Sequence, residues 1–303
     1  MTALAGIGYL LIAFSPALVI FRRIIASDPL RVILFILGAF FWLLSLLLSA
    51  CVWFAVVPLR EHIVFAVMIS VALQEGARLL HFILLKKAQK GLNRMSSNDQ
   101  KLAGVHALQH ARHMLAVVCG LGMGVMASLF LIINVIADFW GSGTVGLPAS
   151  VPQTSDRFTV KLLPDDQNFA ITYSISACML TLCHVFWTVL FWDGCQKRST
   201  TSTWWLGVCF AVLSHYAISA LSFGNRTKYQ AFFMCMQGVV LVADGIASFA
   251  VMGVTVPMLQ RTSRLAFLRL LCVFGCEKET ADDSNRGSEN FVGNRSDALH
   301  VDN

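Results

Sequence analysis

The sequence alternates between long hydrophobic runs and short polar segments along most of its length. A run of about 20 residues crosses the hydrocarbon core of a bilayer when it is helical. Seven runs meet this length, and the predicted spans are residues 4–20, 32–57, 63–85, 114–139, 169–192, 204–221 and 231–256. An open strand in lipid would leave backbone groups without hydrogen bonds, so every span is predicted to be helical.

The predicted fold is therefore an all-α integral membrane protein, a seven-transmembrane helix bundle over residues 1–260 with a tail over residues 261–303. Hydrophobic residues make up 56% of the chain and charged residues only 13%, against about 45–50% and 25% in soluble domains. From residue 277 the tail is polar and acidic, which predicts disorder. The net charge of +6 does not indicate nucleic-acid binding, because the cations stand at the ends of the hydrophobic runs.

The distribution of basic residues predicts the orientation. Of the 23 lysines and arginines, 17 fall in the first, third and fifth loops and the tail, and five fall in the other three loops. Since positive loops stay in the cytoplasm, the N-terminus is predicted to be lumenal or extracellular and the tail cytoplasmic. The sequon at Asn225 would then be lumenal, but it lies so close to the membrane that we expect no glycan there.

A row of small residues marks the fourth span. Gly120, Gly124 and Ser128 recur every four residues, so they share one helix face and form a shallow groove. Small residues in membrane helices let a second helix approach closely. The pattern alone leaves two interpretations open, packing within the chain and contact with another protein.

Several polar residues fall inside the predicted spans, where each one needs a partner. Counted at 1.5 Å per residue, the central ones lie about 13 to 18 Å from the inner ends of their spans, near mid-membrane. They are Glu75, His184, His215 and Asp244, with Gln74 beside Glu75 and Arg78 one turn later. The favoured interpretation is an interhelical hydrogen-bond cluster. A metal or hydrolytic site and a proton or ion pathway are the alternatives.

Two further arrangements are disfavoured. An intramembrane aspartyl protease needs two carboxylates that share a proton, but the predicted topology puts the membrane-associated aspartates at three different depths, namely Asp138, Asp193 and Asp244. Three histidines also share a helix face before the fourth span, at His106, His110 and His113. Since neither a cysteine nor an acid completes that set, a solvated face is favoured over a weak metal site.

The sequence closely resembles the anterior pharynx-defective family in its second span, Asp28–Phe54. Further matches follow in register as far as Leu221: Leu73-Gln74-Glu75 with Arg78, Leu85-Lys86-Lys87-Ala88, Gly91-Leu92, Gly120 to Ser128, Ile133-Asn134, Ala137-Asp138, Gly143 to Gly146, His184-Val185-Phe186-Trp187, Asp193 with Cys195, and Ser214-His215. The third small residue of the fourth span is typically glycine in that family and is Ser128 here. Asp244 and the acidic tail have no counterpart.

The resemblance implies a non-catalytic scaffold subunit of the gamma-secretase complex, without a cofactor. Such subunits assemble with presenilin, nicastrin and the presenilin enhancer in endoplasmic reticulum, Golgi and plasma membranes, among membrane lipids. The complex cleaves type I membrane proteins such as Notch and the amyloid precursor protein. The resemblance implies an assembly role for Gly120, Gly124 and Ser128, and a role for His184 and His215 in keeping the complex assembled and active.

One alternative function stays open at this point. Glu75, His184, His215 and Asp244 together contain ligand types that a metal-dependent intramembrane hydrolase uses, and titratable groups that an ion or proton carrier uses.

Overall fold

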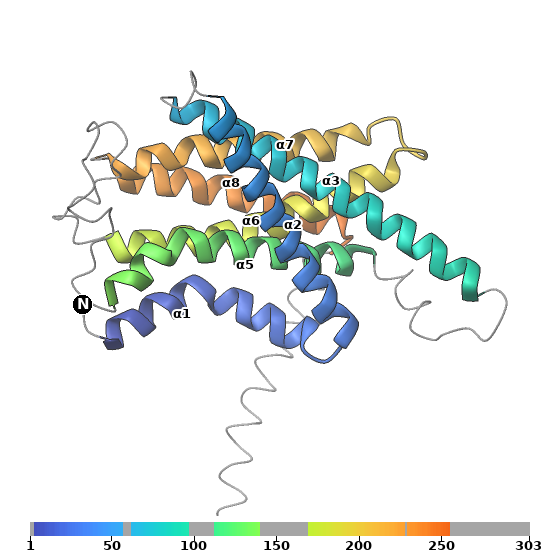
Figure 1. Ribbon diagram of the computed structural model, residues 1–303, viewed down its shortest axis with the longest axis horizontal. Helices are drawn as coiled ribbons and strands as arrows, with labels where there is room; N and C mark the ends of the chain where they lie inside the picture. The colour runs from blue at the N-terminus through green and yellow to red at the C-terminus, as the bar shows by residue number, and fades with distance from the viewer. Residues whose placement is uncertain (1–2, 57–61, 97–111, 140–168, 228, 255–303) are drawn as a thin grey trace, which may run out of the picture. The chain divides into compact units, whose positions relative to one another are not determined.

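A computed structural model describes residues 3–56, 62–96, 112–139, 169–227 and 229–254. Within these ranges the chain forms helices and no strand (Figure 1). Seven of the helices are long and apolar enough to cross a membrane. The prediction of an all-helical chain with seven spans is thus confirmed. The tail, and the disorder predicted from residue 277, lie outside the described residues.

The elements follow the predicted order. In sequence they are α1 (Ala3–Ile20), a π-helical turn η1 (Phe21–Ile25), α2 (Pro29–Ala55), α3 (Ile63–Ser96), α5 (Arg112–Phe139), α6 (Phe169–Lys197), α7 (Trp205–Ser222), a 3-10 turn η3 (Phe223–Arg226) and α8 (Gln230–Val251). All of them belong to one compact unit, Met1–Met252. Just after α8, Gly253 adopts a φ of 69°, which a glycine tolerates at a helix end.

The turn between α1 and α2 explains why α2 begins three residues before the predicted span. Asp28 caps the helix, because its carboxylate accepts a hydrogen bond from the backbone nitrogen of Leu30 at 3.0 Å. Pro29 occupies the first helical position, where a missing N–H costs nothing. Arg31 bonds Asp28 at 3.1 Å and donates to the Ile24 carbonyl at 2.7 Å, so it ties the turn together.

The third helix is longer than its hydrophobic run. The predicted span ended at residue 85, whereas α3 continues to Ser96 and reaches 34 residues, or about 51 Å at 1.5 Å per residue. The hydrocarbon core needs only about 30 Å. The added segment contains lysines, alanine and glutamine, which favour a helix in water as well as in lipid. Hydropathy therefore marked the end of the lipid-embedded part and not the end of the helix.

Helices α5 and α6 form the centre of the bundle. In each of them 61% of the most apolar segment is buried inside the protein, against 17–33% in the other spans. Their mutual contact is the most extensive in the bundle, and α6 also packs on α1, α7 and α8. Helix α2 covers α5 and pairs with α3. The polar residues of α5 and α6 are thereby placed in the protein interior.

The outer helices expose large hydrophobic side chains. The exposed fractions reach 81% for Leu4 on α1, 72% for Phe54 on α2, 66% for Leu213 on α7 and 65% for Ile246 on α8. So much apolar surface is unfavourable in water and favourable against lipid tails. These faces therefore suit a bilayer or the helices of other membrane proteins.

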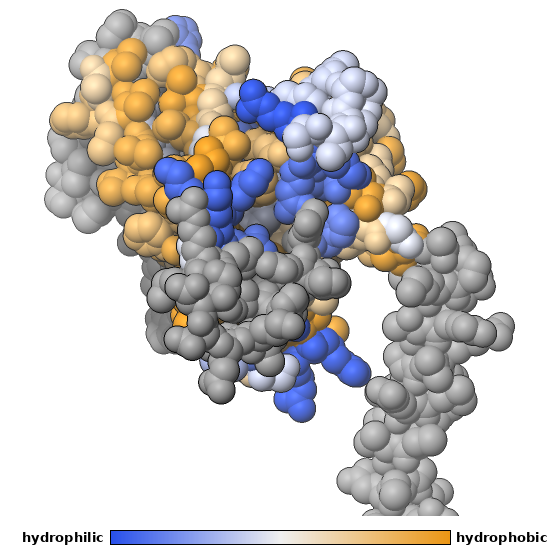
Figure 2. All heavy atoms as spheres, turned by 90° about the vertical axis from the view of Figure 1, so that its right-hand side faces the viewer, coloured by the Kyte–Doolittle hydropathy of each residue, from blue (hydrophilic) through white to orange (hydrophobic). Residues whose placement is uncertain are grey.

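Hydrophilic side chains gather at the end of the bundle where α3 and α6 end (Figure 2). The basic residues there come from the α1–α2 turn, from α3 and from the α6–α7 turn; they include Arg22, Arg23, Arg31, Lys86, Lys197 and Arg198. This is the end that the sequence predicts to be cytoplasmic. The orientation itself stays a prediction.

Candidate functional site

The small residues of α5 face α6 at close range. A Cβ atom built on Gly120 would lie 2.9 Å from the His184 carbonyl oxygen, and one on Gly124 would lie 2.6 Å from the Thr181 carbonyl oxygen. Real Cβ atoms do not come so close to backbone atoms. The two glycines therefore permit an approach of α5 to α6 that any larger residue would prevent.

Ser128 extends this contact by hydrogen bonding. Its hydroxyl donates to the Ala177 carbonyl of α6 at 2.6 Å and lies 2.7 Å from the hydroxyl of Thr181. Thr181 in turn donates toward the Gly124 carbonyl at 3.4 Å. A glycine at position 128 would keep the close approach but lose the two contacts of the Ser128 hydroxyl with α6.

The helix that fills the small-residue groove thus belongs to the same chain. Of the two interpretations that the sequence left open, this is packing within the molecule. The groove positions α6, which carries His184 at the same level as Gly120 and Gly124. An assembly role of Gly120, Gly124 and Ser128 stays a prediction, and it would act through the position of α6.

A second glycine contact, which the sequence analysis missed, lies between α2 and α5. A Cβ on Gly122 would overlap the Phe35 carbonyl oxygen, and one on Gly38 would overlap the Cys119 carbonyl oxygen. Gly122 stands two residues from Gly120, which is about 200° around a helix of 3.6 residues per turn. The Gly-x-Gly-x-Gly pattern at 120–124 therefore indicated that α5 is contacted closely on two opposite faces.

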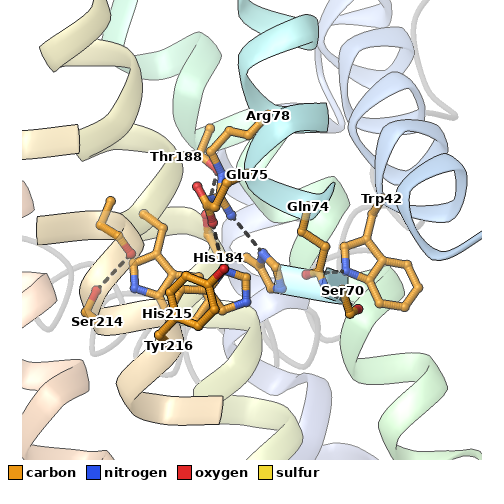
Figure 3. A network of polar contacts seen from close by, with 12 residues as sticks. Trp42, Ser70, Gln74, Glu75, Arg78, His184, Thr188, Ser214, His215 and Tyr216 are labelled. Atoms are coloured by element: carbon orange, nitrogen blue, oxygen red, sulfur yellow. Dashed lines mark hydrogen bonds and ion pairs between the residues drawn. The ribbon is translucent and has the colours of Figure 1, made fainter. Parts of the chain in front are cut away.

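A buried polar network joins α3, α6 and α7 (Figure 3). Glu75 Oε1 pairs with Arg78 on the same helix and with His215 Nδ1 of α7 at 2.7 Å. Arg78 Nη2 contacts His184 Nδ1 of α6 at 3.2 Å. The rings of His184 and His215 are 5.5 Å apart, measured between centroids. The structure thus brings together Glu75, His184 and His215, with Arg78 between Glu75 and His184.

Hydrogen-bonding capacity fixes the protons in this network. Arginine has no acceptor, so His184 Nδ1 must accept from Arg78 and the ring carries its proton on Nε2. The Glu75 carboxylate accepts from Arg78, so His215 Nδ1 donates to it. Glu75 and Arg78 already cancel each other's charge. A proton added to either ring would leave the network with a net positive charge in lipid, so we assign both rings as neutral.

Trp187 links His215 to Asp244. Its ring stacks on His215 with centroids 4.1 Å apart and planes 20° apart, and its Nε1 donates to Asp244 Oδ2 of α8 at 2.9 Å. Among the described residues, Asp244 is thus connected to His215 through Trp187, and it is also hydrogen-bonded to Ser214, the neighbour of His215 on α7. The sequence analysis did not assign Trp187 a role. The available signal was its indole N–H, because a buried tryptophan needs an acceptor.

Gln74 forms a separate branch. Its Oε1 accepts from Trp42 Nε1 of α2 at 3.2 Å, and its Nε2 donates to Ser70 Oγ one turn earlier at 3.2 Å. Gln74 thus ties α2 to α3, and its hydrogen bonds within the described residues go to Trp42 and Ser70 and not to either histidine. The predicted cluster of Gln74, Glu75, His184 and His215 divides into two hydrogen-bonded groups on neighbouring faces of α3 (Figure 3).

A cavity of about 480 Å³ lies beside the network, and we call it the bundle cavity. Its floor includes His184, His215 and Gln74. It extends toward the end of the bundle where α6 begins and α7 ends. The other lining residues are Trp42, Val67, Ser70, Val71, Ala127, Leu131, Thr172, Tyr173, Ser176, Met179, Leu180, Ile218, Ser219, Ser222, Phe223, Asn225 and Gln237.

The other titratable residues that the sequence analysis considered do not belong to the buried polar network. Asp193, near the end of α6, contacts His113 at 3.2 Å and Lys197 at 2.7 Å, far along the helix from the level of Asp244. His106, His110 and the side chain of Asp138 lie outside the described residues. Within the described part of the chain, no three His, Cys, Asp or Glu side chains are grouped so that they could hold a metal ion.

Comparison with known proteins gives one consistent result. The family model "Aph-1 protein" matches residues 4–255. Gamma-secretase subunit aph-1 of Caenorhabditis elegans is 38% identical over 249 residues, which are 80% of this chain and 79% of that protein. Gamma-secretase subunit APH-1B of Mus musculus is 35% identical over 84% of this chain and 90% of its own length. Gamma-secretase subunit Aph-1 of Drosophila melanogaster is 31% identical over 84% and 95%.

Proposed function

Because this chain belongs to the Aph-1 protein family, we propose that it is the non-catalytic scaffold subunit of a gamma-secretase complex. The observation that carries the proposal is the match over residues 4–255 to a family whose curated relatives are named gamma-secretase subunits. The seven spans and the densely packed α5–α6 centre suit a protein that holds other membrane helices in place.

The proposed partners are presenilin, nicastrin and the presenilin enhancer, in endoplasmic reticulum, Golgi and plasma membranes. The complex would cleave type I membrane proteins such as Notch and the amyloid precursor protein. Partner contacts fall on the outer helices in this proposal, because α5 and α6 are mostly buried by their own chain. The large exposed side chains of α1, α2, α7 and α8 supply the apolar surface that such contacts need.

The roles of the carboxylates support a scaffold over a hydrolase. An aspartyl protease site holds two carboxylates close enough to share one proton. In this chain Glu75 is engaged by Arg78 and His215, and Asp244 accepts from Trp187. Each carboxylate thus stabilises the contact between helices. The alternative hydrolase or carrier built on His184, His215, Glu75 and Asp244 has no comparable support.

Co-purification tests the proposal. The tagged chain is expressed in cells that lack their own Aph-1 proteins, extracted in mild detergent and captured. Presenilin and nicastrin are expected in the eluate at stoichiometric amounts. Gly124→Leu is expected to prevent their recovery, because a side chain at this position meets the Thr181 backbone at 2.6 Å and must displace α6.

The matched control is Gly76→Leu in α3, a helix that is not among those proposed to carry the partner contacts. Among the described residues, no heavy atom outside its own helix turn lies within 4 Å of the Cβ position there. This variant should recover both partners as the wild type does. Recovery of neither partner by the wild type, or cleavage of a substrate by the purified chain alone, would refute the scaffold function.

A further inference from the structure

The hydrophilic end of the bundle, where α3 and α6 end, carries more positive charge than its acids neutralise. Of the acids that the structure describes, Asp28 and Asp193 lie at this end, and they pair with Arg31 at 3.1 Å and with Lys197 at 2.7 Å. Within the described part of the chain, the cations at this end that have no acidic partner are Arg22, Arg23, Lys86, Lys87, Lys90 and Arg198. Two of these six, Lys86 and Arg198, are held in place by aromatic rings.

Lys86 of α3 is held close to α6. Its Nζ lies over the ring of Phe82, one turn earlier, at 5.7 Å from the ring centroid. Phe82 is buried and packs on Trp192 of α6, with ring centroids 5.8 Å apart. Since a cation is attracted to the face of an aromatic ring, the ammonium group is kept on the side of α3 that faces α6.

Arg198 projects from a well-defined turn between α6 and α7. Its guanidinium lies over the ring of Trp204, with the central carbon 5.4 Å from the ring centroid. The backbone nitrogen of Thr200 donates to the Lys197 carbonyl at 3.0 Å and so closes the turn. A Cβ on Gly194 would lie 2.7 Å from the Trp204 carbonyl oxygen, so the turn packs directly on the end of α6. The position of the guanidinium is therefore set by the fold.

The two cations converge on the end of α6. Both Lys86 and Arg198 lie close enough to the Cys195 thiol of α6 to interact with it electrostatically. Trp205, the first residue of α7, is 50% exposed beside them in sequence. Exposed tryptophans of membrane proteins sit at the level of the lipid headgroups. The ammonium and the guanidinium thus flank α6 near the depth of the lipid phosphates.

We propose that Lys86 and Arg198 bind the headgroup phosphate of an anionic phospholipid, and we call this pair the headgroup site. The guanidinium offers a planar fork of donors to phosphate oxygens, and the ammonium adds a point charge. Basic pockets between membrane helices bind anionic lipid headgroups in this way. The inference goes beyond the proposed function and does not depend on it, because it concerns the lipid around the chain itself.

The surroundings of the headgroup site favour a lipid over a soluble phosphate. Trp205 and Leu206 at the start of α7 are 50% and 51% exposed, and they offer apolar surface to acyl chains. A soluble anion would gain only the charge contacts, which salt screens at an exposed site. A phosphatidylcholine headgroup fits poorly, since its choline would bring a further cation to a surface that already has an excess of positive charge.

Native mass spectrometry of the purified full chain in detergent tests the proposal. Phosphatidylglycerol and phosphatidylcholine with identical acyl chains are titrated separately, and phosphatidylglycerol is expected to bind more tightly. Lys86→Gln/Arg198→Gln should weaken phosphatidylglycerol binding about thirty-fold, as expected for two lost cations at the membrane surface. The exchange Lys86→Arg/Arg198→Lys keeps both charges and should retain most of the binding.

The matched control is Arg22→Gln/Arg23→Gln, which removes the same charge from the α1–α2 turn. Figure 1 shows this turn apart from the α6–α7 turn at the same end of the bundle, so screening should limit the weakening to less than about three-fold. Equal weakening by the two pairs would show a diffuse surface charge and overturn the proposal. Equal binding of the two lipids, or competition by soluble glycerophosphoglycerol as strong as by the intact lipid, would overturn it as well.

Discussion

The buried charge of Arg78 is compensated by neighbouring groups. The Arg78 guanidinium is fully buried, and it lies between the Glu75 carboxylate and the His184 ring. Its own backbone carbonyl accepts from Trp192 Nε1 at 3.3 Å. Desolvation of an isolated guanidinium would cost far more than the rest of the network contributes. The pairing is therefore a condition for placing α3 against α6.

Removal of the Glu75 charge tests this dependence. Glu75→Gln leaves Arg78 without a counter-ion, and loss of one partner of a buried pair costs about 3–5 kcal/mol. We expect a clearly lower thermal unfolding midpoint in detergent micelles, followed by tryptophan fluorescence. Adding Arg78→Met removes the unpaired charge, so Glu75→Gln/Arg78→Met should recover much of the loss.

The control for this prediction is Lys90→Met, an exposed cation on the same helix, which should change the midpoint little. If the double variant is less stable than Glu75→Gln alone, the two charges do not compensate each other.

The sequence placed Glu75, His184 and His215 near the same depth but did not show how their side chains contact one another. His184 and His215 stand near the middle of consecutive spans with a short connection, so their proximity followed from topology. Arg78 follows Glu75 by one helical turn, a spacing that allows the two side chains to pair, and they are paired. The contact of Trp187 with Asp244 depends on side-chain rotation about α6 and α8. Spacing along the chain carries no information about such rotation.

Among the elements, α5 has the most constrained position. Gly120 and Gly124 meet α6 on one face, and Gly122 meets α2 on the opposite face. Cys119 adds a weak thiol bond, at 3.7 Å, to the Leu34 carbonyl of α2. The helix can neither rotate nor rise without a collision of backbones. This geometry fixes the distance between α2 and α6, and thus the width of the bundle.

Single methyl groups should reveal this constraint. Gly122→Ala is expected to destabilise the protein, because overpacking against the Phe35 backbone costs about 1–3 kcal/mol. Gly238→Ala in α8, where the Cβ position is open, should be neutral or slightly stabilising, since alanine is the better helix former. Thermal unfolding of both variants in the same detergent compares them. Equal midpoints for the two variants would contradict the close α2–α5 contact.

The extent of the elements shows where hydropathy stops being informative. The number and order of the spans followed directly from the apolar runs. The extension of α3 to Ser96 did not, because a helix that leaves the membrane keeps its backbone hydrogen bonds while its side chains become polar. The close contact of Gly38 with α5 could not be predicted from the sequence either. A single glycine in an apolar run gives no sign of the helix that will approach it.

For the molecule as a whole, the membrane orientation is the prediction with the widest consequences. Hydrophilic side chains gather at one end of the bundle (Figure 2). Arginines and lysines are among them, and the sequence therefore predicts this end to be cytoplasmic. A glycosylation acceptor inserted within residues 140–168 should therefore be modified in cells. The same acceptor inserted after Thr200, in the α6–α7 turn, should stay unmodified. Mobility shifts that an endoglycosidase reverses report both results, and the reverse pattern would invert the topology.

The double glycine contact of α5 also bears on how this protein can change over evolutionary time. A helix held on two sides has almost no position at which a larger residue is harmless, so its sequence should drift slowly. The outward faces of α1 and α8 meet lipid or a partner, and there one aliphatic residue can replace another freely. Mutational tolerance should thus rise from the centre of the bundle to its periphery, so that new partners can be accommodated while the inner frame stays unaltered.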